Sequence, residues 1–262
     1  MPYHNKNSLS QNFIKDRDIV QQLIAVSDLS INDTVIEIGP GHGIITTLLC
    51  GKVKQVLAIE KDQALAKILT KRIQNITNLQ IINQDFLDYQ LPANNYKIFA
   101  NIPFSITAEI LNKILLSDNL PQSMFLIMQY ETAEKFVGSK FESQSSILFK
   151  PFFEIEILGD IDRTSFTLKP QVKIVFVKFT KRETPFIKDA DKLNFYNFVI
   201  YGFNQWQPTV LDAYKKVLTY TQLMTIKKTL KIGDVPPSQL SFDKWLLFFK
   251  TYLKIVNDKS RL

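Results

Sequence analysis

A glycine-rich turn between two apolar strands is the feature of this sequence that most restricts the fold. The β-branched stretch that begins at Thr34 leads into Gly39-Pro40-Gly41-His42-Gly43, and a helical stretch from Ile44 to Leu49 comes next. Three glycines within five residues permit a tight turn and let backbone amides approach a ligand closely. A lone glycine cluster is weak evidence, so the interpretation depends on the strands and side chains further along the chain.

A second apolar strand, Gln55 to Ile59, ends in Glu60 about twenty residues beyond the start of the turn. A carboxylate at this position can accept hydrogen bonds from both ribose hydroxyls, so the spacing indicates a nucleoside-binding crevice. The glycines run G-x-G-x-G rather than the G-x-G-x-x-G of nicotinamide-binding folds, and Glu37 adds a negative charge beside them. That charge would repel a pyrophosphate and suits a ligand with an ammonium or sulfonium group. We therefore expect S-adenosylmethionine as the cofactor.

Polar side chains come directly after two further strands of the expected sheet. A third apolar strand, Leu79 to Gln84, leads to Asp85, which either accepts from the exocyclic amine of the cofactor's adenine or caps a turn. A fourth, Tyr96 to Ala100, ends in Asn101-Ile102-Pro103-Phe104. An Asn amide both accepts and donates, which suits the edge of an adenine, and Phe104 offers a stacking face. The alternative is an ordinary strand-to-turn boundary, since Asn and Pro are common turn residues.

Strand and helix patterns alternate from Asp33 to about Ile157, which predicts a doubly wound, Rossmann-like α/β fold with a parallel sheet. We expect a helix over Ser105–Leu116, directly after the Asn101 turn. Val172–Phe179 alternates apolar and basic residues and predicts an edge-region strand with one wet face. Residues 181–185 are the expected linker to a second domain.

The charge of the chain is distributed unevenly. Residues 1–180 contain 18 Lys and Arg against 18 Asp and Glu, whereas residues 181–262 contain 14 against 7. We expect residues 1–180 to form a cofactor-binding catalytic domain and residues 181–262 a basic helical domain that binds RNA through its phosphates. The alternative for the basic part is a solvated helical bundle with surplus lysine.

Cysteine and histidine usage excludes several other classes of protein. One cysteine permits no disulfide within the chain, and with two histidines it leaves no convincing zinc site, so no metal is expected. Residues 1–15 are polar rather than a signal peptide, and no apolar run is long enough to span a bilayer. We expect a cytoplasmic protein that does not bind a membrane.

The ordered motifs resemble those of the rRNA adenine N6-dimethyltransferases. They are Ser10-Gln11-Asn12-Phe13, the run Glu37 to Gly43, Glu60, Asp85, Asn101 to Phe104, and Phe166 to Val172. Within that superfamily the chain is most similar to the erythromycin-resistance (Erm) methyltransferases of bacteria. Ser10 before Gln-Asn-Phe favours this group, and so does Ile102, where the sister group usually has Leu. The resemblance extends from residue 7 to residue 260.

This resemblance implies a class I methyltransferase sheet with a small helical C-terminal domain, acting as a monomer. It implies methylation of the N6 of one adenine in 23S rRNA, expected to be dimethylation, with S-adenosylmethionine as donor. The outcome would be resistance to macrolides, lincosamides and streptogramin B. The alternatives are a small-subunit rRNA adenine dimethyltransferase, whose targets are two adjacent adenines, and a non-catalytic RNA-binding relative.

The same resemblance assigns roles to individual positions. Catalytic roles fall on Asn101, Ile102, Pro103, Phe104 and Phe166, and cofactor contacts on Gln11, Asn12, Ile14, Glu37, Gly39, Gly41, Glu60, Lys61, Asp85, Phe86 and Asn101. Asn101 and the Ile102 carbonyl would accept hydrogen bonds from the target amine and aim its lone pair at the methyl group. Phe104 and Phe166 would hold the adenine once it leaves its stack. Phe104 stands where Tyr is commoner, and Leu168 replaces a proline of the last motif.

Overall fold

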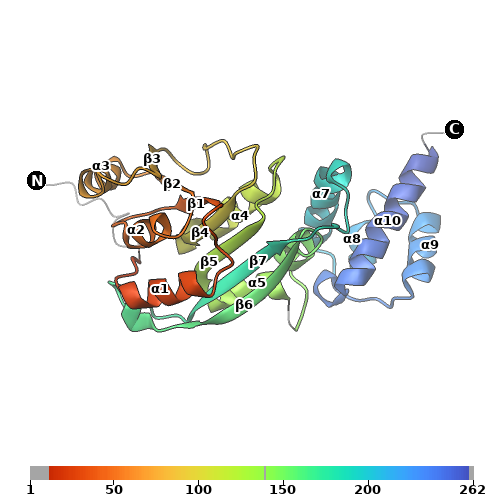
Figure 1. Cartoon of the computed structure of the whole chain (residues 1–262). Coiled ribbons are helices and arrows are strands. Elements are labelled where there is room, and N and C mark those ends of the chain that lie inside the picture. Colours follow the sequence, from red (N-terminus) through yellow and green to blue (C-terminus); the bar gives the residue numbers. More distant parts are fainter. Residues whose placement is uncertain (1–11, 139, 260–262) are drawn as a thin grey trace, which may run out of the picture. The chain divides into compact units, whose positions relative to one another are not determined.

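The computed structural model describes residues 12–138 and 140–259, and within them the chain folds into two compact units (Figure 1). Unit 1 contains the described residues up to Ala133 together with Glu154–Lys181. Unit 2 contains Glu134–Phe153 and the chain from Arg182 onward, so the chain passes between the units three times. The assignment of residues 1–180 to a catalytic domain and of residues 181–262 to an RNA-binding domain stays a prediction.

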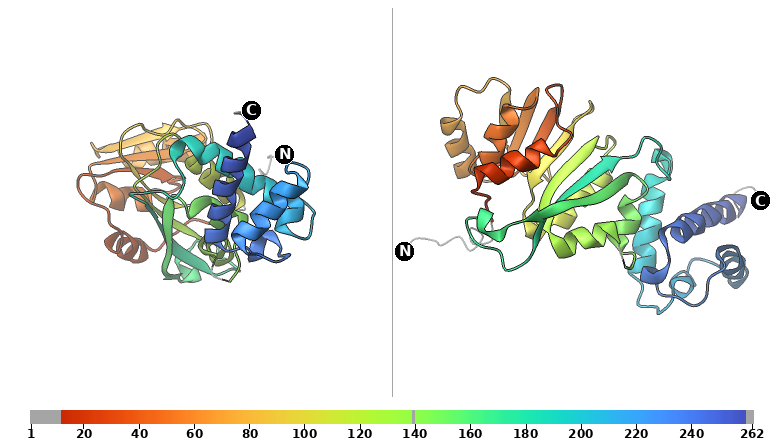
Figure 2. Two further views of the ribbon diagram at one scale, coloured as in Figure 1. Left: turned by 90° about the vertical axis from the view of Figure 1, so that its right-hand side faces the viewer. Right: turned by 60° about the horizontal axis from the view of Figure 1, so that its bottom comes forward.

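A seven-stranded sheet organises unit 1 (Figures 1 and 2). Its strands are β1 (Thr34–Ile38), β2 (Gln55–Glu60), β3 (Leu79–Asn83), β4 (Lys97–Asn101), β5 (Ser123–Gln129), β6 (Phe153–Ile161) and β7 (Ile174–Lys181). They lie in the order β3-β2-β1-β4-β5-β7-β6. Strands β3, β2, β1, β4 and β5 are parallel, and β7 pairs with β5 in the antiparallel sense. The predicted Rossmann-like sheet is confirmed.

Helices precede, connect and follow the parallel strands, with no α-helix in the described residues between β3 and β4. They are α1 (Arg17–Ala25), α2 (Ile44–Cys50), α3 (Gln63–Arg72), α4 (Thr107–Leu115) and α5 (Tyr130–Val137), with 3₁₀ turns η2 (Phe104–Ile106) and η3 (Arg163–Ser165). Helix α1 begins after Asp16, whose carboxylate accepts hydrogen bonds from the amides of Asp18 and Ile19. Helix α4 begins two residues later than the sequence predicts, because the Ile106 amide donates to the Pro103 carbonyl and closes a 3₁₀ turn first.

Alternation along the strands decides which side chains reach the functional edge. Val35 and Phe99 belong to the core cluster that also includes buried residues of α1 and α2. Because strand side chains alternate with a period of two, Glu37 and Asn101 lie on the same face as Val35 and Phe99. Both are at the carboxyl ends of their strands. The fold therefore places these two polar groups on one face of adjacent strands.

The edge-region position expected for β7 agrees with the sheet order, but the wet face expected for it does not agree with its burial. It is second from the edge of the sheet, with β6 outside it, and Ile174 to Val177 are all buried. The predicted wet face was therefore wrong for most of the strand. Lys178, which suggested that face, is only partly exposed because it forms an ion pair with Asp28 at 2.9 Å.

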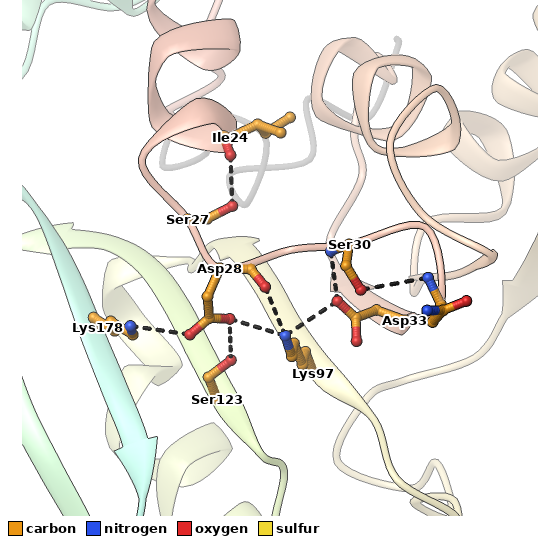
Figure 3. Close-up of polar contacts among 9 residues, drawn as sticks. Ile24, Ser27, Asp28, Ser30, Asp33, Lys97, Ser123 and Lys178 are labelled. Atoms are coloured by element: carbon orange, nitrogen blue, oxygen red, sulfur yellow. Dashed lines mark hydrogen bonds and ion pairs between the residues drawn. The ribbon is translucent and has the colours of Figure 1, made fainter.

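That ion pair belongs to a polar network at the amino ends of β4 and β5 (Figure 3). Lys97 Nζ lies 2.9 Å from Asp28 Oδ1 and 3.1 Å from Asp33 Oδ2, and Ser123 Oγ donates to Asp28 Oδ1. Partial burial would raise the pKa of Asp28, but hydrogen bonds from Lys178 and Lys97 outweigh it and hold the pKa below its usual value. The network joins four segments at the end of the sheet opposite to the predicted site.

Unit 2 is helical around an aromatic core. Its elements are α6 (Gln144–Phe149), α7 (Lys192–Phe203), α8 (Val210–Ala213), α9 (Tyr220–Leu230) and α10 (Phe242–Lys259), with 3₁₀ turns η4 (Asp189–Asp191) and η5 (Pro237–Gln239). The Phe198 ring of α7 contacts Tyr214, Trp245 and Phe248 at centroid distances of 4.8, 6.0 and 4.9 Å. None of the helices in the described part of the chain is long and apolar enough to cross a membrane.

Candidate active site

The predicted functional residues meet at the carboxyl edge of the parallel strands. The strand order β3-β2-β1-β4 brings together the chain segments that leave the ends of four strands. Asp85 comes after β3, Glu60 ends β2, the glycine turn comes after β1, and Asn101 ends β4. The chain direction across the sheet reverses between β1 and β4, which is where open α/β sheets bind their ligands.

All three glycine amides of the turn donate hydrogen bonds to acceptors of the chain itself. Gly39 N donates to Ile59 O at 2.9 Å, Gly41 N to Glu60 Oε2 at 3.2 Å, and Gly43 N to Pro40 O at 2.9 Å. The turn therefore offers none of these amides to a pyrophosphate, in agreement with the ligand class expected from the sequence. Gly39 adopts φ of +67°, and no atom lies within 4 Å of where a Cβ would stand there. The backbone at Gly39 can thus be approached closely.

Glu37 is a buried acid without a partner. Its side chain is 1% exposed, and neither carboxylate oxygen has a hydrogen-bond partner among the described residues, nor has the hydroxyl of Thr46 beside it. Burial raises the pKa of Glu37 to about 8 against the nearby hydroxyl and amide of Thr46, which lower it, and the Glu60 carboxylate adds to the rise. A buried acceptor left unpaired in this way is what a cationic ligand group would satisfy.

Glu60 and Asp85 already hold partners from the chain. Glu60 accepts hydrogen bonds from the amides of Gly41 and Asp62, at 3.2 and 2.9 Å. Burial raises the pKa of Glu60, against these hydrogen bonds. Asp85 Oδ2 lies 2.6 Å from Lys61 Nζ, and this ion pair holds the pKa of Asp85 below its usual value. Two acceptors therefore stand at the ends of β2 and β3.

Phe86, the residue after Asp85, is buried at 4% exposure. The Lys113 ammonium lies 5.9 Å from the centroid of its ring. The Phe86 ring therefore lies in the interior after the end of β3, whereas the Lys61 side chain is exposed at the surface. Both lie beside Asp85, where the sequence predicts the adenine of the cofactor.

The Asn101 tetrapeptide turns sharply out of β4. Asn101 Nδ2 donates to the backbone carbonyl of Asn12 at 2.8 Å. Ile102 is buried and its amide donates to Ile127 O, while the Pro103 carbonyl accepts from Thr107 Oγ1 at 3.1 Å. Phe104 is half-buried and packs against the core cluster. The amide of Asn101 is therefore held in one orientation at the strand end.

The segment after residue 11 is tied to two distant motifs. Ile14 and Phe166 form an isolated antiparallel bridge, and Thr167 N donates to Phe13 O at 2.8 Å. The Phe13 ring covers the turn, since a Cβ on Gly41 would lie 2.5 Å from Phe13 Cε1. These contacts place Asn12 beside Asn101 and Phe13 beside the glycine turn, and they join this segment to the start of the last predicted motif, whereas Ser10 lies outside the described residues.

Some predicted side chains face the interior instead of the crevice. Phe166 and Ile14 are 1% and 6% exposed and belong to the core cluster, so stacking of Phe166 on a base would require the bridge to move. Asn12 has a buried Oδ1 without a partner. Gln11 lies outside the described residues. The roles assigned to these residues stay predictions.

The sequence analysis did not single out Phe13 or Thr46 as site residues. Phe13 was noted only within a motif, and its contact with Gly41 spans a separation in sequence that no local pattern reports. Thr46 was recognisable as a polar residue within the apolar helical run Ile44–Leu49. It is fully buried on α2 beside Glu37.

Two further observations limit what this part of the structure can bind. Within residues 12–138 and 140–259, no group of three or more His, Cys, Asp or Glu is arranged to hold a metal ion. A separate cleft between α1 and α2 contains none of the predicted site residues. Its lining consists of Arg17, Gln21, Ile24, Ala25, Thr47, Leu48, Gly51 and Lys52. The carboxyl edge is therefore the candidate site. Its carboxylate and amide oxygens suit an organic ligand that donates hydrogen bonds from amine and hydroxyl groups.

Comparison with known proteins agrees with this geometry. The family described as "Ribosomal RNA adenine dimethylase" matches residues 3–254. The rRNA adenine N-6-methyltransferase of Limosilactobacillus reuteri is 31% identical over 95% of this chain and 98% of its own length. The ribosomal RNA small subunit methyltransferase A of Chlorobium phaeobacteroides is 32% identical over 94% and 92%. The crystal structure of the 23S rRNA methyltransferase ErmE shares the fold, with a TM-score of 0.76 at 24% identity over 92% of this chain and 99% of that one.

Proposed function

This chain belongs to the ribosomal RNA adenine dimethylase family, and we propose that its substrate within the family is an adenine of 23S rRNA. It is an rRNA adenine N6-methyltransferase. The observation that carries the chemistry is the hydrogen bond from Asn101 Nδ2 to the Asn12 carbonyl. Because a carbonyl only accepts, the amide must direct Nδ2 toward it, which leaves Oδ1 as an acceptor for an amine.

The crevice fits S-adenosylmethionine. The buried Glu37 side chain, ionised beside a cation, suits its charged end, Glu60 its ribose hydroxyls, and Asp85 the amine of its adenine. Gly39, which has open space where a Cβ would stand, allows it to approach the turn, whereas Gly41 makes room for the Phe13 ring. When bound, the cofactor supplies an electrophilic methyl group.

The residues of the chain position the target adenine. Its exocyclic nitrogen is a poor nucleophile, because its lone pair is delocalised into the ring. Hydrogen bonds from that amine to Asn101 Oδ1 and to the Ile102 carbonyl would favour a pyramidal nitrogen with the lone pair free to attack. Phe104 would stack on the base after it leaves the RNA, which costs least in an irregular loop. No general base is needed while the amine keeps its protons during attack.

Sequence positions support the choice of the large subunit. Ser10 and Ile102 match the Erm side of the resemblance. The second candidate is a small-subunit adenine dimethyltransferase, which the similarity to the Chlorobium enzyme favours. With 23S rRNA as substrate, we further propose that the protein works as a cytoplasmic monomer, adds two methyl groups and confers resistance to macrolides, lincosamides and streptogramin B.

Methylation of purified ribosomal RNA tests the proposal. The protein is incubated with labelled S-adenosylmethionine and either 23S or 16S rRNA, both naked and in subunits, and modified adenines are mapped by mass spectrometry. We expect label at one adenine of 23S rRNA and a rise in the inhibitory concentration of erythromycin in cells that express the protein. Label at two adjacent adenines of 16S rRNA would instead establish the second candidate. Cells expressing Asn101→Ala serve as the matched control.

A further inference from the structure

Trp206 is the most exposed large apolar side chain that the structure describes. It is 83% exposed, whereas the other tryptophan, Trp245, is fully buried in unit 2. Burial of a tryptophan removes a large apolar surface from water and is a strong source of stability. Trp206 contributes little of this to the fold, so most of its ring is open to contact with a partner.

The loop that carries Trp206 is anchored on both sides. Before it, the Phe203 ring stacks on Trp245 at 5.3 Å with an interplanar angle of 16°, and Asn204 N donates to Ile200 O. After it, Val210 N donates to Val235 O at 2.8 Å. A short loop held in this way presents its side chain to solvent at little further cost in entropy, which favours binding.

The charge of unit 2 indicates the class of partner. Lys215 pairs with Asp212, and Lys227 with Asp234 at 2.8 Å. Lys216 and Lys228 are exposed and have no acidic partner within the described residues. Unit 2 therefore carries both unpaired lysines and an exposed aromatic ring, and these two features suit a polyanion that also has flat apolar groups.

We propose that Trp206 is a stacking platform for an unpaired base of the RNA substrate, separate from the target adenine. RNA is recognised largely through unpaired bases in loops, and every base has a face on which an indole can stack. The inference rests on the proposed function, since it requires an RNA substrate. It adds a contact in unit 2 that contributes to affinity rather than to chemistry.

Tryptophan fluorescence tests the proposal directly, because only one of the two indoles is open to a quencher. Acrylamide quenching is measured on the full chain with and without purified 23S rRNA, and with a fully paired RNA duplex as a second probe. We expect 23S rRNA to shield Trp206 and the duplex to shield it much less. In Trp206→Phe, the quenchable fraction should disappear, which assigns the signal.

Affinity provides the second measurement. Trp206→Ala should raise the Kd for 23S rRNA by roughly tenfold while leaving the slope of log Kd against log salt unchanged, because a stacked base carries no phosphate charge. Trp206→Phe should stay within about threefold of wild type, since a phenyl ring still stacks. The matched control is Leu193→Ala in the same unit, which removes a side chain that is 60% exposed but cannot stack, and its Kd should not change.

Three results would overturn the inference. They are an unchanged Kd in folded Trp206→Ala, an unshielded Trp206 in the RNA complex, and shielding that rises with protein concentration in the absence of RNA, which would mark a contact between copies of the chain. If wild type methylates 23S rRNA and any of these results is seen, the inference alone fails. If wild type neither binds nor methylates any rRNA, the proposed function fails as well.

Discussion

At the scale of single residues, the two ends of the Asn101 amide serve different purposes. Its Nδ2 holds the Asn12 carbonyl, and this bond leaves Oδ1 pointing away from that partner. The side chain is half-buried at the end of β4. An acceptor that is fixed before the substrate arrives costs no reorganisation during the reaction.

Asn101→Ala should therefore lower kcat by about a hundredfold or more, which is the usual effect of losing one oriented polar group. Affinity for S-adenosylmethionine should stay within about tenfold, because the amide acts mainly on the target amine in the transition state. Single-turnover methylation and calorimetry measure the two quantities separately. A kcat near that of wild type would contradict the role given to Asn101.

Because of the buried Glu37 side chain, we expect the stability of the ligand-free protein to depend on pH. Burial raises its pKa to about 8 in the folded state, above the ordinary value of 4.5. Its contribution to stability is therefore fully present below the ordinary value and is lost as pH rises through the folded value. The Tm of wild type should fall relative to that of Glu37→Gln as pH rises across this interval. Parallel Tm curves for the two proteins in thermal melts would show that Glu37 does not titrate in this range.

At the scale of elements, the strands and the glycine turn were predictable from local patterns, whereas their arrangement was not. β1, β2, β3 and β4 were anticipated to within a residue or two, because each is a short apolar run between turn residues. The strands that pair with β7 were not predictable, because pairing depends on residues far apart in the sequence rather than on the alternation within one strand. For the same reason the site's polar residues were predictable from strand ends, but the Asn12–Asn101 contact was not.

The contact between the glycine turn and the Phe13 ring can be tested by adding one methyl group. In Gly41→Ala, φ of +53° and a Cβ 2.5 Å from Phe13 Cε1 should displace the ring and lower affinity for S-adenosylmethionine by about tenfold or more. Gly39→Ala has the same kind of φ, but its methyl group enters the space left open for the cofactor, so it should lower affinity without displacing the Phe13 ring. Calorimetry compares them.

A second change separates the ring contact from backbone strain. Replacement of Phe13 by Leu in the Gly41→Ala background should restore part of the lost affinity, because it removes the clash and leaves the strain. If the double variant binds no better than Gly41→Ala alone, strain at residue 41 accounts for the whole effect.

The network around Lys97 should stabilise the end of the sheet that lies opposite to the candidate site. Lys97→Met leaves Asp28 and Asp33 without their shared cation and should cost roughly 1.5–3 kcal/mol in urea unfolding near neutral pH. The pKa of Asp28 is lowered, so its contribution is present above its ordinary pKa and fades as pH falls through the folded value. The difference between wild type and Lys97→Met should therefore shrink in acid. A difference that grows in acid would refute this account.

At the scale of the whole molecule, the surplus of positive charge divides into lysines with and without acidic partners. Lys215 and Lys227 are paired, whereas Lys216 and Lys228 are not paired within the described residues. In the sequence the four are equivalent, because a count of charges does not show which aspartates lie next to which lysines. Only unpaired lysines can exchange counterions for phosphates without first breaking an ion pair.

We therefore expect the double variant Lys216→Gln/Lys228→Gln to weaken rRNA binding and to flatten log Kd against log salt by about 0.7–0.9 per lost phosphate contact. The matched control, Lys215→Gln/Lys227→Gln, removes the same number of lysines and should change the slope less. Titrations of rRNA at several salt concentrations measure both. Equal slopes in wild type and both variants would move the RNA contacts to other parts of the chain.

The strand order also affects how the protein is made. β5 leaves the ribosome well before β7, since the excursion of the chain into unit 2 and the whole of β6 lie between them. Until Lys181 has emerged, β5 has an open hydrogen-bonding edge and β6 lacks its sheet neighbour. The nascent sheet is thus exposed to pairing with other chains. A gene shortened before this codon should yield an aggregating product rather than a smaller enzyme.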